Sequence, residues 1–426
     1  MPQFRHSRFL GNDNPTKGAG SARLIFVLCL AEVFSMASFA SFPALLPTFV
    51  SEWGLSATEA GWISGIYYAG YTIAVPVLTS LTDRVDPRRI YLGSALVAGL
   101  AALGYAFLAE GFWSAMAWRA LTGVGLAGTY MPGLKALSDR IEGAAQSRAI
   151  SFYTASFGIG ASISFLLTGE LATGLGWRWA FGLSALGSLV AMAIVAVVLK
   201  PRAPSREEGL HETHFLDFRP VFKNLRAMGF VLAYTTHNFE LFGFRSWIVA
   251  FLVFSQALHP GYESLLSATA IAAIFNLFGW PASILGNEAA VRLGRQRTIT
   301  IVMTASAAFA CVFGFTASLP YLAVIALGAL YAVTVTGDSS AITAGAVAAA
   351  RPDQRGATMA VHSTLGFTGA FAGPVVFGWV LDTAGGPASQ TAWGVAFASM
   401  GAVLILGPIA LAICSRAARR QSCEQS

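Results

Sequence analysis

The sequence predicts an all-α polytopic membrane protein in which twelve transmembrane helices form two pseudo-symmetric six-helix bundles. Hydrophobic residues make up 55% of the 426-residue chain and charged residues only 11%, whereas soluble domains carry roughly 25% charged residues. The apolar residues fall into twelve runs, each suited to the roughly 20 residues that cross a bilayer core of about 30 Å. One long polar segment separates six runs from six. An ordinary soluble domain is therefore excluded.

The expected transmembrane segments are 23–50, 60–80, 89–109, 112–136, 147–169, 178–199, 227–256, 264–285, 298–317, 320–345, 355–381 and 391–414. The first apolar run exceeds the roughly 7–15 apolar residues of a secretory signal, so a retained helix is expected. The expected divisions are an N-terminal tail (1–22), an N-terminal bundle (23–199), a linker (200–226), a C-terminal bundle (227–414) and a C-terminal tail (415–426). The linker is expected to hold a short surface helix at Phe215–Phe222.

The basic residues orient these segments. Of the 27 Lys and Arg residues, all except Arg119, Arg178 and Arg245 fall in the two tails or in alternate loops on one side. Positive charge collects in cytoplasmic loops, so both termini and the linker are expected in the cytoplasm and the protein in the cytoplasmic (inner) membrane. Cys29 and Cys311 lie in apolar runs, and the other two cysteines lie at the cytoplasmic end, so no disulfide is expected.

The two halves of the chain resemble each other. Gln146–Ala149 opens the fifth segment, and the similar Gln354–Ala357 opens the eleventh, at an offset near half the chain. Repeats of this kind are typical of transporters that build one central site between two bundles.

Two motifs identify a family resemblance. Leu81–Arg89, between the second and third segments, resembles the loop signature of the major facilitator superfamily, although Asp86 and Pro87 depart from the usual Gly and basic residue. Arg119, Gly123 and Gly125 in the fourth segment resemble a second motif of that family. The resemblance implies a secondary active transporter that works by alternating access, in which the two bundles rock about a central site.

The first motif supplies a cytoplasmic gate. The carboxylate of Asp83 can meet the N-terminus of another helix, whose unpaired N–H groups favour an anion. The resemblance implies that this helix is the eleventh segment, near Arg355, and that the contact breaks when the inner side opens. The basic residues of the motif, Arg84, Arg88 and Arg89, could instead serve only to set topology.

Ionisable groups inside the membrane are expected to face a cavity or a partner, because each costs about 2.5–3.5 kcal/mol to insert. The candidates for the substrate or proton path are Glu32, Arg119, His237, Asn238, Glu240 and Arg245. The last four share one arc of the seventh segment, and Phe239 and Phe242 lie on its apolar face. His237 and Glu240, three residues apart, are expected to hold or pass a proton. The alternative is that Glu240 and Arg245 pair structurally with Arg119 and Glu32.

Further candidates for the cavity wall are Tyr67, Tyr68, Tyr71, Tyr153, Asn276, Trp280, Asp338 and His362. For each of these, simple packing is the competing interpretation. No catalytic residue, metal site or cofactor is expected, and the absence of a phosphate-binding loop argues against direct use of ATP.

The expected function is proton-coupled symport of a small solute, with an anion favoured by the two membrane arginines. The alternatives are an efflux antiporter of the same fold, a membrane sensor that transports nothing, or an intramembrane enzyme. The fifth segment lacks the proline typical of family exporters at Phe157–Ser162, which weighs against export. The expected partners are a small-molecule substrate, protons and the lipid bilayer, with no nucleic acid, and the protein is expected to be a monomer.

Overall fold

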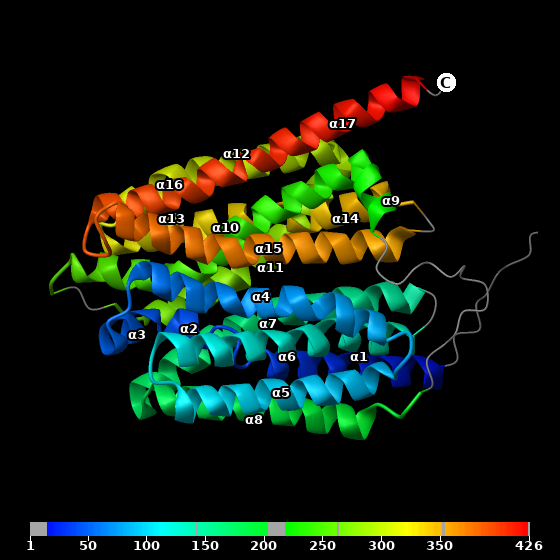
Figure 1. Ribbon diagram of the computed structural model, residues 1–426, viewed down its shortest axis with the longest axis horizontal. Helices are drawn as coiled ribbons and strands as arrows, with labels where there is room; N and C mark the ends of the chain where they lie inside the picture. The colour runs from blue at the N-terminus through cyan, green and yellow to red at the C-terminus, as the bar shows by residue number, and fades with distance from the viewer. Residues whose placement is uncertain (1–14, 142–143, 203–217, 262–263, 352–353, 425–426) are drawn as a thin grey trace, which may run out of the picture.

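The computed structural model describes residues 15–141, 144–202, 218–261, 264–351 and 354–424, and all regular structure in these ranges is helical. Figure 1 shows two bundles lying side by side, one from the N-terminal half of the chain and one from the C-terminal half. Most of the expected N-terminal tail and most of the expected linker lie outside the described residues.

The N-terminal bundle contains α1 (Pro15–Ser35), α2 (Ser41–Ala44), α3 (Leu46–Trp53), α4 (Ala57–Leu81), α5 (Pro87–Leu108), α6 (Phe112–Ser138), α7 (Ala144–Leu175) and α8 (Trp177–Val198). The short α9 (Arg219–Lys223) precedes the C-terminal bundle. That bundle contains α10 (Leu225–Ala257), α11 (Ala268–Leu293), α12 (Arg295–Phe313), η1 (Gly314–Thr316), α13 (Tyr321–Gly337), α14 (Ser339–Ala349), α15 (Arg355–Thr383), α16 (Gln390–Leu404) and α17 (Leu406–Glu424). The twelve expected crossings correspond to these helices, with α1–α3, α13–α14 and α16–α17 each forming one crossing.

Within the described residues, nine helical segments are long and apolar enough to cross a membrane by length and composition alone. The other three crossings are α1–α3, α4 and α6. The last two lie against each other over small residues: a Cβ atom added at Gly123 of α6 would collide with the carbonyl oxygen of Tyr67 on α4. Small residues allow such close helix packing inside a membrane.

The prediction of one continuous first helix over 23–50 was wrong. Helix α1 ends at Ser35, and the chain turns before α2 begins. Ser164 of α7 bonds the interrupted backbone: its Oγ accepts from Ala40 N at 2.9 Å and donates to Ala37 O at 2.8 Å. A helix can break inside a membrane only where such partners satisfy the freed backbone groups.

Several other boundaries differ from expectation, and two of them concern polar segments. The surface helix expected at Phe215–Phe222 is seen as α9 at Arg219–Lys223, and residues 215–217 lie outside the described residues. Helix α17 continues to Glu424, beyond the expected end at 414. Neither segment continues an apolar run there, so hydropathy alone could not place these helix ends.

The two ends of the molecule differ in how the halves meet. We call the end where α8 finishes and α10 begins the linker end, and the opposite one the far end. Toward the far end, one hydrophobic cluster combines both halves, whereas toward the linker end every cluster belongs to one half alone. Helices α4 and α15 pack across the halves, as do α7 and α11. The structure is therefore closed between the halves at the far end.

Candidate functional site

Glu32 of α1 is fully buried in the N-terminal half. Its Oε2 accepts hydrogen bonds from the Tyr153 hydroxyl of α7 at 3.0 Å and from Ser35 Oγ at 3.2 Å. Its Oε1 has no partner among the described residues. Glu32 is thus held by hydroxyl groups and not by a basic side chain.

Glu240 of α10 has a similar setting in the C-terminal half. Its Oε1 accepts from Ser306 Oγ of α12 at 2.9 Å and from the Tyr331 hydroxyl of α13 at 3.0 Å. In the described part of the chain neither carboxylate forms an ion pair. The interpretation that Glu240 and Arg245 pair structurally with Arg119 and Glu32 was therefore wrong.

His237 lies next to Asp338 and not next to Glu240, and the expectation that His237 and Glu240 hold or pass a proton stays a prediction. His237 Nδ1 lies 2.8 Å from Oδ1 of Asp338, and both side chains are buried. Asp338 occupies the break between α13 and α14, which brings its carboxylate to α10. The spacing along α10 does place His237 and Glu240 on neighbouring positions, but the hydroxyls of α12 and α13 engage Glu240. The Gly337-Asp338 sequence followed by two serines was the available signal for the break.

A short aromatic stack extends from this pair. The Tyr234 ring stacks with two histidine rings, and its centroid lies 5.8 Å from that of His237 and 4.0 Å from that of His362 of α15. Thr343 Oγ1 lies 3.4 Å from His362 Nε2. His362 thus joins the buried polar groups of this half, and so does the buried Asn238.

Arg119 of α6 is only 1% exposed and has no carboxylate partner in the described residues. Its guanidinium carbon lies 4.4 Å from the centroid of the Tyr67 ring, a cation–π contact. Nη1 donates a long bond of 3.4 Å to Ser38 O, while Nε and Nη2 have no partner among the described residues.

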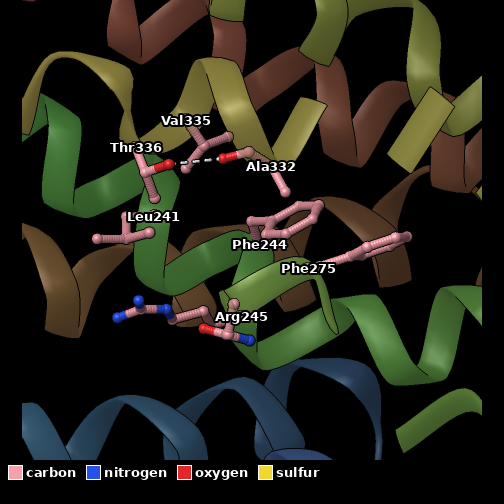
Figure 2. A pocket seen from close by; sticks show the side chains of 8 residues that line it. Leu241, Phe244, Arg245, Phe275, Ala332, Val335 and Thr336 are labelled. Atoms are coloured by element: carbon pink, nitrogen blue, oxygen red, sulfur yellow. Dashed lines mark hydrogen bonds between the residues drawn. The ribbon is translucent and has the colours of Figure 1, made fainter. Parts of the chain in front are cut away.

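Arg245 of α10 is the counterpart in the other half, 8% exposed. Its guanidinium carbon lies 5.3 Å from the Phe242 ring centroid, and its Nε is unpartnered within the described ranges. Arg245 also lines a small pocket, and Figure 2 shows its guanidinium pointing away from Phe244 and Phe275. The pocket residues are Leu241, Phe244, Arg245, Phe275, Asn276, Ala332, Val335 and Thr336.

Aromatic rings occupy the space between the two halves. Tyr68 of α4 lies 4.5 Å from Phe242 of α10, and Tyr71 stacks on Phe367 of α15 at 4.1 Å, measured between ring centroids. Sequence reasoning placed Phe242 on an apolar face and did not select Phe367, because nothing in the sequence distinguishes an interface phenylalanine from a core one. Trp280, a cavity candidate, is 45% exposed and lies outside the described pocket.

The gate motif lies at the linker end. Asp83 and Arg89 are exposed. Arg88 Nη2 donates to Ala196 O near the end of α8 at 2.8 Å, and the Asp86 side chain accepts from Arg88 N at 3.0 Å and from Arg202 N at 2.9 Å. Arg88 thus ties α5 to α8, a contact beyond any role in topology. Asp86, which departs from the family pattern, serves as the N-cap of α5.

The chain forms two helical bundles, and each bundle buries ionisable groups. This arrangement is typical of polytopic membrane transporters. Residues 28–290 match the family model of the Major Facilitator Superfamily, and the chain belongs to this family. Its relatives and structural neighbours are transporters and not enzymes.

Several known proteins are similar to this chain. The Niacin transporter NiaP of Acinetobacter baylyi is 25% identical over 42% of this chain and 39% of its own length. The Probable L-galactonate transporter of Escherichia coli is 24% identical over 84% of this chain and 83% of its own. A Probable multidrug-efflux transporter of Mycobacterium tuberculosis is 29% identical over 57% of this chain and 50% of its own length. This chain thus covers less than half the length of the A. baylyi relative.

Solved structures support the fold. A bacterial homologue of the lysosomal transporter Spinster, in an inward-facing unoccupied conformation, has a TM-score of 0.70 at 14% identity over 93% of this chain and 95% of its own. The nucleoside transporter NupG has a TM-score of 0.73 at 15% identity, over 91% of this chain and 99% of its own.

Proposed function

We propose that this protein is a secondary active transporter that carries a small organic anion across the cytoplasmic membrane by alternating access, coupled to protons. The observation that carries the proposal is a pair of buried arginines, Arg119 in one half and Arg245 in the other, which have no carboxylate partner among the described residues.

The charge of these arginines supports an anionic substrate. Arginine stays protonated in proteins, and a buried charge is costly unless it is paired. The two buried glutamates do not supply the pairing, because hydroxyl groups engage them instead. An anion bound near both guanidinium groups would supply the missing charge and would contact both halves at once.

The names of two relatives agree with this substrate class. Niacin and L-galactonate, named in the relatives from A. baylyi and E. coli, are both carboxylic acids. The relative named for multidrug efflux represents the competing function.

The arrangement of the halves supports alternating access. The halves share one core at the far end and have separate cores at the linker end. The loop and helix-end arginines Arg88, Arg140, Arg202 and Arg295 lie at the linker end. Because positive charge collects on the cytoplasmic side, we assign the linker end and both termini to the cytoplasm, and the structure to an inward-facing state.

Proton coupling is supported by Glu32 and Glu240. Each carboxylate is removed from water and lacks a basic partner in the described residues, and a carboxylate in that position is costly to keep charged. Proton binding would remove this cost. The His237–Asp338 pair is a second group that can hold a proton in the same half.

Uptake by purified protein in proteoliposomes tests the proposal. We expect nicotinate or galactonate to accumulate when the outside is made acidic, and an uncoupler to abolish accumulation. Arg119→Gln and Arg245→Gln should each lower uptake at least tenfold, because a hydrogen bond to a charged group contributes about 1.5–3 kcal/mol. The matched control is Arg178→Gln, since Arg178 also lies over a ring, that of Trp177, but is exposed. Uptake of cationic drugs with no response to anions would overturn the proposal in favour of drug efflux.

A further inference from the structure

We infer that the substrate is an aromatic carboxylate, whose ring lies between aromatic side chains of the two halves and whose carboxylate lies between Arg119 and Arg245. This inference rests on the proposed transport of a small organic anion and names its chemical class.

The aromatic side chains form a cluster that belongs to both halves. Tyr68 and Tyr71 come from α4, Phe242 from α10 and Phe367 from α15. Besides the two pairs already described, Phe242 lies 5.7 Å and Tyr68 6.5 Å from Phe367, measured between ring centroids. We call these four side chains the ring cluster. Every pair within it that joins α4 to α10 or α15 must separate when the halves move apart.

Each guanidinium group lies beside an aromatic ring that belongs to the ring cluster or contacts it. Arg119 lies over Tyr67, whose ring centroid is 5.3 Å from that of Tyr68, and Arg245 lies near Phe242. Tyr68 thus contacts one ring beside each arginine, Tyr67 beside Arg119 and Phe242 beside Arg245. A carboxylate beside Tyr68 can therefore accept from the unpartnered N–H groups on either side, which are charge-assisted bonds.

The faces of the rings favour an aromatic ligand over an aliphatic one. The stacked ring pair of Tyr71 and Phe367 has an interplanar angle of 29°. A planar aromatic ligand inserted between two such rings replaces one ring contact by two, and each contributes beyond its buried area. An aliphatic ring of the same size buries similar area but offers no face to stack.

A purely structural role for the ring cluster makes a different prediction. If the rings served only to pack the halves together, the site would bind an aliphatic and an aromatic carboxylate of equal size equally well. The two interpretations therefore differ in ligand shape, and that difference can be measured on the unmodified protein.

The experiment measures ligand binding to the purified full chain by thermal shift and by titration calorimetry. The probes are benzoate, cyclohexanecarboxylate, benzamide and gluconate. We expect benzoate to bind at least tenfold more tightly than cyclohexanecarboxylate, and benzamide, which lacks the charge, to show no binding. Equal affinity for benzoate and cyclohexanecarboxylate would overturn the inference.

Variants of the ring cluster locate the effect. Phe242→Leu and Phe367→Leu keep the apolar volume but remove the ring, so they should reduce the preference for benzoate over cyclohexanecarboxylate to less than threefold. Phe107→Leu is the matched control, because Phe107 of α5 is exposed and does not belong to the ring cluster. Retention of the full preference in both cluster variants would overturn the placement of the ligand ring.

The gluconate arm separates this inference from the proposed function. Binding of gluconate without benzoate would refute the aromatic class and leave organic-anion transport standing. Binding of none of the three carboxylates would refute both.

Discussion

Asp382, at the end of α15, binds Thr58 in the first turn of α4 at the far end. Its Oδ2 accepts from Thr58 N at 2.7 Å and from Thr58 Oγ1 at 2.6 Å, and its Oδ1 accepts from Ala57 N at 3.0 Å. The N-terminus of a helix favours an anion. This contact therefore joins the C-terminal half to the N-terminal half where the molecule is closed.

Asp83 occupies the related position in the other half. It follows the end of α4 at the linker end, where α15 begins, and it is exposed in this structure. The two aspartates thus offer the same kind of contact at opposite ends, and among the residues that the structure describes only the contact at the far end is formed. The expected gate contact of Asp83 stays a prediction for the opposite conformation.

Asp382→Asn should weaken closure at the far end. The loss of a charge from three hydrogen bonds costs about 1–3 kcal/mol, which shifts the population toward separated halves at that end. Spin labels at Glu110 and Ser318, which are exposed and belong to opposite halves, should report a larger fraction of long distances. Asp83→Asn is the comparison and should shift the same distances in the opposite sense or not at all. An unchanged distribution in Asp382→Asn would contradict the role of this contact.

Gly61→Ala should also disfavour the closed far end. A Cβ atom at Gly61 of α4 would collide with the carbonyl oxygen of Pro374 on α15, and overpacking of this kind costs typically about 1–3 kcal/mol. Because the collision lies between the halves, the labels should report opening at little cost in thermal stability. Gly93→Ala is the control, since no atom lies within 4 Å of a Cβ there.

Glu240→Gln should abolish substrate accumulation driven by a pH gradient and leave substrate exchange at equal pH intact. The amide oxygen of glutamine can still accept from Ser306 and Tyr331, so the fold should persist. The amide cannot bind and release a proton near neutral pH, so uptake driven by a pH gradient should be lost while substrate exchange at equal pH remains. Glu32→Gln should behave in the same way through its bond from Tyr153. Normal gradient-driven uptake in both variants would exclude these carboxylates from proton coupling.

His237 and Asp338 should be energetically coupled. Two buried groups 2.8 Å apart are expected to show an interaction energy of about 0.5–3 kcal/mol in a double-mutant cycle. The cycle would use His237→Ala, Asp338→Ala and the double variant, with stability measured by unfolding in detergent. Strict additivity would show that the closeness of the two groups has no energetic consequence.

Local hydropathy explains how much of the fold could be predicted. A run of apolar residues partitions into a bilayer whatever surrounds it, so the twelve crossings, the division into six and six, and the buried ionisable groups follow from residue types and spacing. The breaks at residues 36–40 and at Asp338 could not be predicted in this way. They depend on partners such as Ser164 and His237, which lie far away in the sequence.

By itself the sequence thus determined the class of protein, the helix count and the family, because each is encoded in local composition or in a short motif. Only the tertiary structure decided which buried charges meet. It paired His237 with Asp338, gave hydroxyl partners to Glu32 and Glu240, and left Arg119 and Arg245 without a carboxylate in the described residues. The physical reason is that electrostatic and hydrogen-bond energies depend on distances of a few ångströms between helices, and helical periodicity within one segment does not determine those distances.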